Sequence, residues 1–304
     1  GLSLTRYPMY ATLIANLINI FINYILIFGK WGFPKMGVVG AGVGTLISRL
    51  VMLFLLWFFL KQLKKTKVYL EKIQFLVLDS IILKKIMGLG LPSALQMFFE
   101  IGVFTAAIWL SGTLGKNAQA ANQIALNLSS MTYMIAVGLG VAATIRVGNQ
   151  KGLNQAVELR RIAKSVFLMG LIFATLFAAL FMVFHELLPG FYLDLDDAIN
   201  FKDNNEVIDL AAQLLIIAGL FQISDSIQVV FLGALRGLQD VKIPTLITFS
   251  AYWIVGFPLS YYLGNSVRYG SVGIWMGLLA GLTAASVFLY LRFDYLSKKL
   301  ILKK

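Results

Sequence analysis

The chain has 304 residues, of which 59% are apolar and 13% are charged, whereas soluble domains are about half apolar and about a quarter charged. The apolar surface therefore exceeds what one water-soluble core could bury, and the composition places the chain in a lipid bilayer. The sequence has no cysteine and one histidine, so zinc sites, thiol nucleophiles and serine-histidine-aspartate triads are poorly supplied. We expect neither an enzyme nor a bound cofactor.

Apolar runs of membrane-spanning length, which is roughly 20 residues, recur along the whole chain. They predict an all-α polytopic membrane protein with eight transmembrane helices. The first run is too long for a signal peptide and has no small-residue cleavage pattern. The approximate spans are 9–28, 41–60, 87–110, 120–143, 164–187, 208–234, 244–263 and 271–292.

The formal charge of +12 is segregated by loop. If the first helix runs outward from the cytoplasm, 21 of the 26 Lys and Arg residues fall on the cytoplasmic side and 5 outside. This asymmetry fixes the orientation by the positive-inside rule and puts the C-terminus in the cytoplasm. The basic excess is therefore a topology signal, and we expect no nucleic-acid partner.

Four segments are predicted. Residues 1–60 form a two-helix remnant of an N-terminal lobe, and residues 87–292 form a six-helix C-terminal lobe. Residues 61–86 mix lysines with apolar residues at helical spacing, which is typical of an amphipathic linker on the cytoplasmic lipid surface. Specific lipid recognition is the alternative interpretation of that linker. Residues 293–304 are a basic cytoplasmic tail.

Two short patterns occur twice. The stretch GLSLTRYP at the start returns as GLQDVKIP 236 positions later, and the glycines of 37–44 return with the same spacing in 270–277. This indicates an internal repeat. Four helices precede the second copy and none precedes the first, so we expect a truncated chain whose parent has two parallel six-helix halves. The glycines favour close helix packing over a phosphate-binding loop, because they open an apolar run and follow no strand.

Two carboxylates lie near the middle of predicted spans, Glu100 and Asp225. A charged residue there costs roughly 2.5 to 3.5 kcal/mol on insertion scales, so such residues generally face a polar cavity or a partner. We find no Lys or Arg in mid-span to neutralise them. Each must then bind a cation or take up a proton, the working states of a cation-coupled carrier. The alternative is a structural role, in which each acid is protonated and hydrogen-bonded within the packed helices.

Amides cluster around both carboxylates at helical spacing, and they suit either cation coordination or hydrogen bonds to a substrate. Helix-to-helix hydrogen bonding explains any single one equally well. Nearby aromatic rings could line a site for lipophilic cations through cation-π contacts, although such rings are common in membrane cores. The amides are Gln96, Gln222, Gln228, Asn122, Gln123 and Asn127, and the possible lining aromatics are Phe98, Phe99 and Phe221.

The segments GLPSALQMFFE, FQISDSIQVVFLGALRGLQDVKIP and AYWIVGFPLSYYLG resemble the multidrug and toxic-compound extrusion (MATE) family, specifically its bacterial sodium-coupled branch. The resemblance covers essentially the whole chain and aligns its helices with the fifth to twelfth of the family's twelve. It maps the family's second-lobe cation site onto Glu100 and Asp225, with Na⁺ there as a hypothesis. Some relatives have a tyrosine one turn before the aspartate, where this chain has Phe221. The family's first-helix aspartate has no counterpart in these residues.

The resemblance implies a monomeric antiporter in the bacterial inner membrane that exports cationic amphipathic compounds in exchange for Na⁺ or H⁺, as two lobes rock about a central cleft. The 304 residues alone would then not transport. The runner-up is a flippase for lipid-linked sugars, which would need a cleft rich in Arg and Lys. A membrane enzyme and a passive interaction subunit are less consistent with the residues, because mid-span carboxylates have no evident use in the subunit.

Overall fold

The computed structural model describes residues 5–63, 79–193, 201–267 and 269–302. Within these ranges every regular element is a helix, and eight helices are long and apolar enough to cross a membrane. The predicted fold class and number of spans are therefore confirmed. The helices are longer than predicted, because hydropathy does not detect the polar turns at their ends.

The chain forms two compact units, residues 1–80 and residues 81–304. The division falls inside the predicted linker, of which residues 64–78 lie outside the described ranges. From Ser80 onward the predicted linker is already the start of a membrane helix. The predicted tail is likewise helical as far as Leu302, as the continuation of the last span.

The first unit is a hairpin of two antiparallel helices, α1 (Arg6–Phe28) and α2 (Gly37–Gln62). Two glycines of α2 let the helices approach closely: a Cβ on Gly40 would lie 2.8 Å from the Leu26 carbonyl oxygen, and one on Gly44 would meet Asn23. A polar contact supports the pair, since Asn19 Nδ2 donates to Ser48 Oγ over 3.2 Å. The packing role predicted for these glycines is confirmed.

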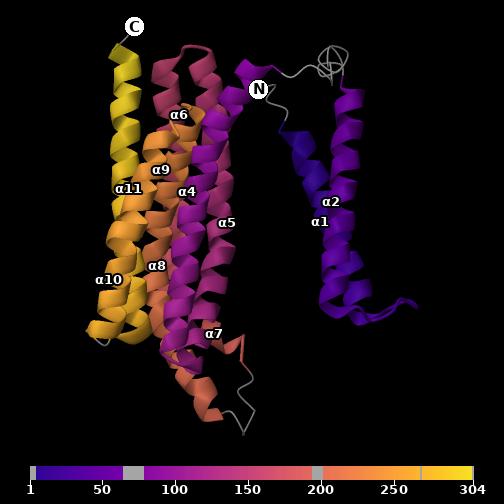
Figure 1. Cartoon of the computed structure of the whole chain (residues 1–304), viewed down its shortest axis with the longest axis vertical. Coiled ribbons are helices and arrows are strands. Elements are labelled where there is room, and N and C mark those ends of the chain that lie inside the picture. The colour runs from indigo at the N-terminus through magenta and orange to yellow at the C-terminus, as the bar shows by residue number, and fades with distance from the viewer. Residues whose placement is uncertain (1–4, 64–78, 194–200, 268, 303–304) are drawn as a thin grey trace. The chain divides into compact units, whose positions relative to one another are not determined.

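The second unit is a bundle that surrounds one central helix, α8 (Phe201–Gly237). Helix α8 packs against α5 (Lys116–Gly152), α6 (Ala156–Val183) and α11 (Gly270–Leu302). As a result, 61% of the most apolar stretch of α8 is buried. Figure 1 shows α4 (Ser80–Thr113) running alongside these helices. The short helix α7 (Leu187–Gly190) precedes α8.

Helix α4 is joined to its neighbours by several side-chain hydrogen bonds. Thr245 Oγ1 donates to the Pro92 carbonyl over 2.8 Å, and Trp253 Nε1 donates to the Phe99 carbonyl over 3.0 Å. Further toward α7, its apolar residues Val103, Ala107 and Leu110 enter the hydrophobic core. The helix thus has polar links along one part of its length and apolar packing along another.

The seventh span is a composite of α9 (Lys242–Phe249), η1 (Ser250–Gly256), α10 (Phe257–Tyr261) and η2 (Tyr262–Ser266). The two η segments are π-helical, so their backbone hydrogen bonds reach one residue further than in an α-helix. The Phe257 N–H accordingly donates to the Tyr252 carbonyl. In this span Gly256 lies against Gly281 of α11, where a Cβ on Gly281 would be 2.8 Å from the Gly256 Cα.

The repeated glycines play the same part in both units. Gly37 and Gly270 are the first residues of α2 and α11, and each has a positive φ, 52° and 56°. One ladder step later, a Cβ on Gly273 would lie 2.5 Å from the Leu263 carbonyl oxygen, just as Gly40 abuts α1. The sequence repeat therefore corresponds to a repeated structural unit, in which a glycine-rich helix packs on the helix before it.

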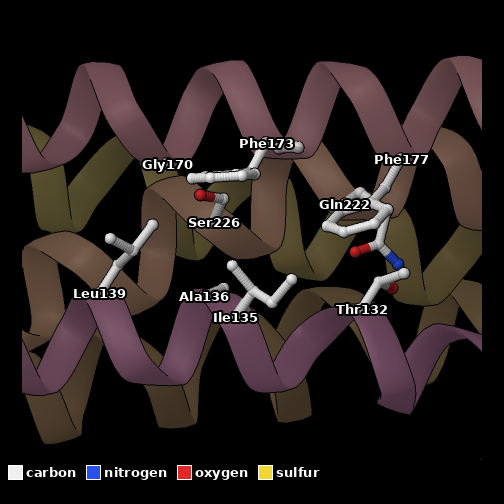
Figure 2. Close-up of a pocket in the computed structure, with 10 residues that line it drawn as sticks. Thr132, Ile135, Ala136, Leu139, Gly170, Phe173, Phe177, Gln222 and Ser226 are labelled. Atoms are coloured by element: carbon white, nitrogen blue, oxygen red, sulfur yellow. The ribbon is translucent and has the colours of Figure 1, made fainter.

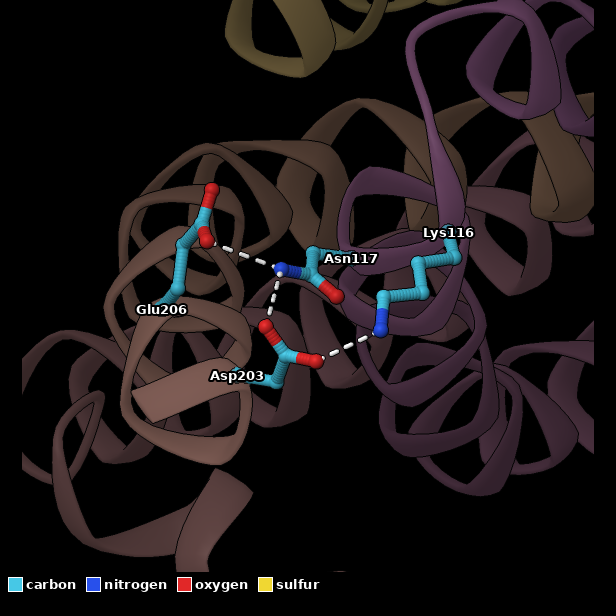
Figure 3. A network of polar contacts seen from close by, with 4 residues as sticks. All are labelled: Lys116, Asn117, Asp203 and Glu206. Atoms are coloured by element: carbon cyan, nitrogen blue, oxygen red, sulfur yellow. Dashed lines mark hydrogen bonds and ion pairs between the residues drawn. The ribbon is translucent and has the colours of Figure 1, made fainter. Parts of the chain in front are cut away.

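A polar network ties the first turns of α5 and α8 (Figure 3). Lys116 Nζ lies 2.5 Å from Asp203 Oδ2, and Asn117 Nδ2 donates to Glu206 Oε2 over 2.8 Å. The side chains of Lys116 and Asp203 are 80% and 40% exposed, so solvent screens their attraction.

We expect Lys116→Met to change the stability of the protein very little. Exposed ion pairs contribute little net free energy, so the melting temperature in detergent should shift by no more than about 2 °C. Thermal unfolding of the purified variant measures this. A large drop would mean that the network of Figure 3 anchors the two helices.

Candidate functional site

The structure brings the two predicted carboxylates, Glu100 of α4 and Asp225 of α8, to the wall of one cavity in the second unit. The cavity has a volume of about 490 Å³ and lies among α4, α5, α8 and α11. Such a volume accommodates a small organic molecule. The other predicted residues that line it are Gln123, Asn127, Phe221 and Gln222.

Hydrogen bonds from buried amides hold Glu100 in place. Gln96 Nε2 donates to Glu100 Oε2 over 2.6 Å, and Gln228 Nε2 donates to Glu100 Oε1 over 3.2 Å. Gln228 is itself held, because the Tyr252 hydroxyl donates to its Oε1 over 2.6 Å. Gln96 and Gln228 are 2% and 0% exposed and do not line the cavity, so they support the carboxylate from behind.

Asp225 is less well supported. Within the part of the chain that the structure describes, its carboxylate has no hydrogen-bond or ion-pair partner, and the charged group that acts on it is Glu100. A carboxylate that is removed from water without a partner carries a large desolvation cost. A bound cation or a proton offsets that cost, so the cavity is chemically suited to take up positive charge.

Besides Gln96 and Gln228, three more of the predicted residues do not line the cavity. Phe98 is 66% exposed on the outside of α4, and Phe99 stacks on Phe249 with ring centroids 4.8 Å apart. Asn122 is buried and accepts a hydrogen bond from Trp275 Nε1 over 2.9 Å. Helical geometry explains why the two phenylalanines do not line the cavity. Phe99 and Phe98, at i−1 and i−2 from Glu100, lie on another face of α4, whereas Phe104, at i+4, lines the cavity.

Besides Phe104, sequence reasoning missed three aromatic residues of the site. Tyr133 and Trp275 line the cavity, and the Tyr133 hydroxyl is within hydrogen-bonding reach of Glu100. Tyr252 supports Gln228 as described above. Tyr133 follows Ser129 and Ser130 at helical spacing, so a search for a polar stripe along α5 would have found it. Trp275 had no comparable signal, because α11 is apolar around it.

Gln222 also borders a second, much smaller hollow of about 10 Å³ among α5, α6 and α8 (Figure 2). Gln222 and Ser226 of α8 face it together with Thr132 of α5. Its volume matches a single water molecule, and these three polar side chains in an otherwise apolar lining could give such a water hydrogen-bond partners. Gln222 thus lines both the small hollow and the main cavity.

The prediction that no basic residue lies in mid-span is wrong at one position and incomplete at another. Arg49 lies at the middle of α2, within the first unit. In the second unit Arg236, near the end of α8, donates from Nη2 to Gln96 Oε1 and acts electrostatically on Glu100. Arg49 falls inside the predicted span 41–60, so its place on the cytoplasmic side was inconsistent with that span. Arg236 was placed in the cytoplasm because loop assignment takes no account of the reach of an arginine side chain.

Comparison with known proteins is consistent with this arrangement. The family model MatE matches residues 92–262. The multidrug resistance protein MdtK of Yersinia pseudotuberculosis serotype O:1b is 38% identical over 304 residues, and that of Photorhabdus laumondii is 39% identical over 303. Each match covers 98% of this chain and 64% of the relative.

Solved structures share the fold. The eukaryotic MATE transporter AtDTX14 superposes with a TM-score of 0.78 at 20% identity, covering 96% of this chain and 63% of that one. A MATE protein in a bent conformation gives a TM-score of 0.79 at 20% identity, covering 97% of this chain and 62% of that one. The helical arrangement described above therefore also occurs in solved MATE structures.

Proposed function

Because this chain belongs to the MatE family, we propose that its protein is a cation-coupled antiporter that exports cationic amphipathic compounds across the bacterial inner membrane. The observation that carries the proposal is the cavity of about 490 Å³ with Glu100 and an unpartnered Asp225 in its wall. The name of the MdtK relatives as multidrug resistance proteins supports the substrate class.

The mechanism follows from competition for negative charge. The two carboxylates repel each other in one cavity, so the cavity attracts a coupling ion or an organic cation. Loading one displaces the other, which exchanges them when the cavity opens alternately to each side. Tyr133 and Phe104 are aromatic residues of the lining that can attract an organic cation, whereas a hard ion such as Na⁺ prefers the carboxylate and amide oxygens.

The energy source is the inward movement of Na⁺ or H⁺. Each elementary charge that moves down the membrane potential releases about 2.3 kcal/mol per 100 mV, before any concentration gradient is added. An exported compound of charge +1 costs the same amount on its way out, so a one-for-one exchange draws on the concentration gradient of Na⁺ or H⁺. Each further coupling ion adds about 2.3 kcal/mol per 100 mV. The distribution of Lys and Arg supports a cytoplasmic C-terminus.

A flippase for lipid-linked sugars is less well supported. A pyrophosphate would need several basic groups in the cavity, and none of the residues lining the cavity is Lys or Arg. Arg236 reaches Gln96 from behind the cavity wall.

We expect Glu100→Gln to stop cation-driven export. The amide keeps the size of the side chain but removes the charge that draws both cations, so export should fall by about a hundredfold. Ethidium uptake into inverted vesicles, which corresponds to export from the cell, measures this under a Na⁺ gradient and separately under a proton gradient. The vesicles are made from cells that express the reading frame encoding this chain. If neither gradient drives export by the wild type, the proposed function fails.

The matched control is Glu158→Gln, which makes the same change on α6. The Glu158 side chain is 46% exposed and does not line the cavity. Export by this variant should equal that of the wild type. Full export by Glu100→Gln, at wild-type protein levels, would remove Glu100 from the coupling step.

A further inference from the structure

A buried amide joins a guanidinium to the cavity carboxylate. Arg236, near the end of α8, donates to Gln96 Oε1, and Gln96 Nε2 donates to Glu100 Oε2 over 2.6 Å. Gln96 is 2% exposed, whereas Arg236 is exposed to solvent at the other end of the link. The two ends of this connection are 140 and 4 residues from Gln96 in sequence, so only the fold brings them together.

The chemistry of the three groups fixes the direction of the link. A guanidinium only donates hydrogen bonds and a carboxylate only accepts them, while an amide has one end of each kind. Gln96 therefore satisfies both neighbours in a single orientation, with its oxygen toward Arg236 and its nitrogen toward Glu100. Hydrogen bonds to charged groups are about twice as strong as neutral ones, so this orientation is well defined.

The two carboxylates of the cavity consequently differ in their electrostatic surroundings. Glu100 has a permanently charged guanidinium acting on it and amide donors on both oxygens. Asp225 has no such partner within the described residues. A nearby positive charge and bound donors both weaken the attraction of a carboxylate for a further cation. Glu100 should thus bind a cation more weakly than Asp225 does.

We infer that Arg236 is a positioning residue that acts through Gln96 to orient Glu100 and to weaken its hold on a bound cation, which speeds release of that cation. The inference rests on the proposed function and deepens it, because it makes the two carboxylates unequal: Asp225 retains the cation and Glu100 lets it go. A carrier needs such a balance, since a cation held too tightly is not delivered.

The test measures ethidium binding to the purified protein by fluorescence anisotropy, together with ethidium export from vesicles. Arg236→Gln removes the charge but keeps an N–H that can donate to Gln96. We expect its dissociation constant for ethidium to fall roughly three- to tenfold, as one charge screened by solvent allows, while its maximal export rate also falls. Arg236→Lys, which keeps the charge, should restore the wild-type affinity.

The matched control is Arg161→Gln, which removes one positive charge from an exposed arginine of α6. Arg161 Nη1 lies 3.9 Å from Glu158 Oε2. Its affinity for ethidium should match the wild type. An Arg236→Gln affinity equal to or weaker than that of the control overturns the inference while leaving the proposed function intact. A wild type that binds no ethidium overturns both. If Arg236→Gln cannot be purified, Arg236→Met is measured with the same expected tightening.

Discussion

Asp225→Asn is expected to abolish cation-driven export. The substitution keeps the volume of the side chain on α8 but removes the unpartnered charge of the cavity. Removing the carboxylate that pairs with a bound cation costs about 3 kcal/mol or more, which corresponds to a loss of more than about a hundredfold in cation affinity. Ethidium export under a Na⁺ gradient and under a proton gradient measures the effect, with the amount of protein in the membrane determined by immunoblot.

Two variants make this result interpretable. Asp209→Asn makes the same chemical change at an exposed position of the same helix, and we expect it to export at the wild-type rate. Asp225→Glu keeps the charge and should retain part of the activity. Because Asp225→Asn also relieves a desolvation cost, the variant should be at least as stable as the wild type. Unchanged export by Asp225→Asn would exclude Asp225 from the mechanism.

Gly233→Ala is expected to destabilise the second unit strongly, although it adds a single methyl group. Helices α5 and α8 touch here backbone to backbone: a Cβ on Gly233 would lie 2.2 Å from the Gly140 carbonyl oxygen. Thr144 Oγ1 donates to the carbonyls of both glycines over 2.9 Å, so a displacement also disturbs hydrogen bonds. The two helices would have to separate, at a cost of about 3 kcal/mol or more.

Thermal unfolding in detergent measures this cost, with Gly138→Ala as the control. A Cβ on Gly138, which lies on α5, would meet nothing within 4 Å. Alanine there should be neutral or stabilising by about 1 kcal/mol, because it restricts the unfolded backbone and favours the helix. The same substitution is therefore expected to change sign between two glycines of the bundle. Equal melting temperatures for the two variants would contradict the direct backbone contact.

Hydropathy predicted the architecture well for a physical reason. A bilayer requires apolar helices of fixed length, so the eight spans are legible in the sequence and are confirmed. The ends of the helices were less predictable, since α11 runs ten residues past its predicted end, through the polar turns to Leu302. The cost of a carboxylate in lipid likewise singled out Glu100 and Asp225, which the structure places in one cavity.

Contacts between helices were not predictable from one sequence. Spacing along α4 put Gln96 on the face of Glu100, but nothing in the sequence indicated that Arg236 reaches Gln96. The same limit applies to Trp275, whose ring lines the cavity from α11, and to Asn122, which it engages. Helical periodicity states which residues share a face, whereas the partner of that face depends on how the bundle packs.

The π-helical turns of the seventh span also bear on how this protein aligns with its relatives. A π turn accommodates an additional residue, and each added residue rotates the following helix face by about 100°. The apolar period before Ser250 is therefore out of phase with the period after Gly256. Loss of one residue between these positions would convert the turn to α-helix without shortening the span appreciably. Evolutionary insertions and deletions of one residue should accordingly concentrate here, and a gap at this point is a structural equivalence rather than a break in homology.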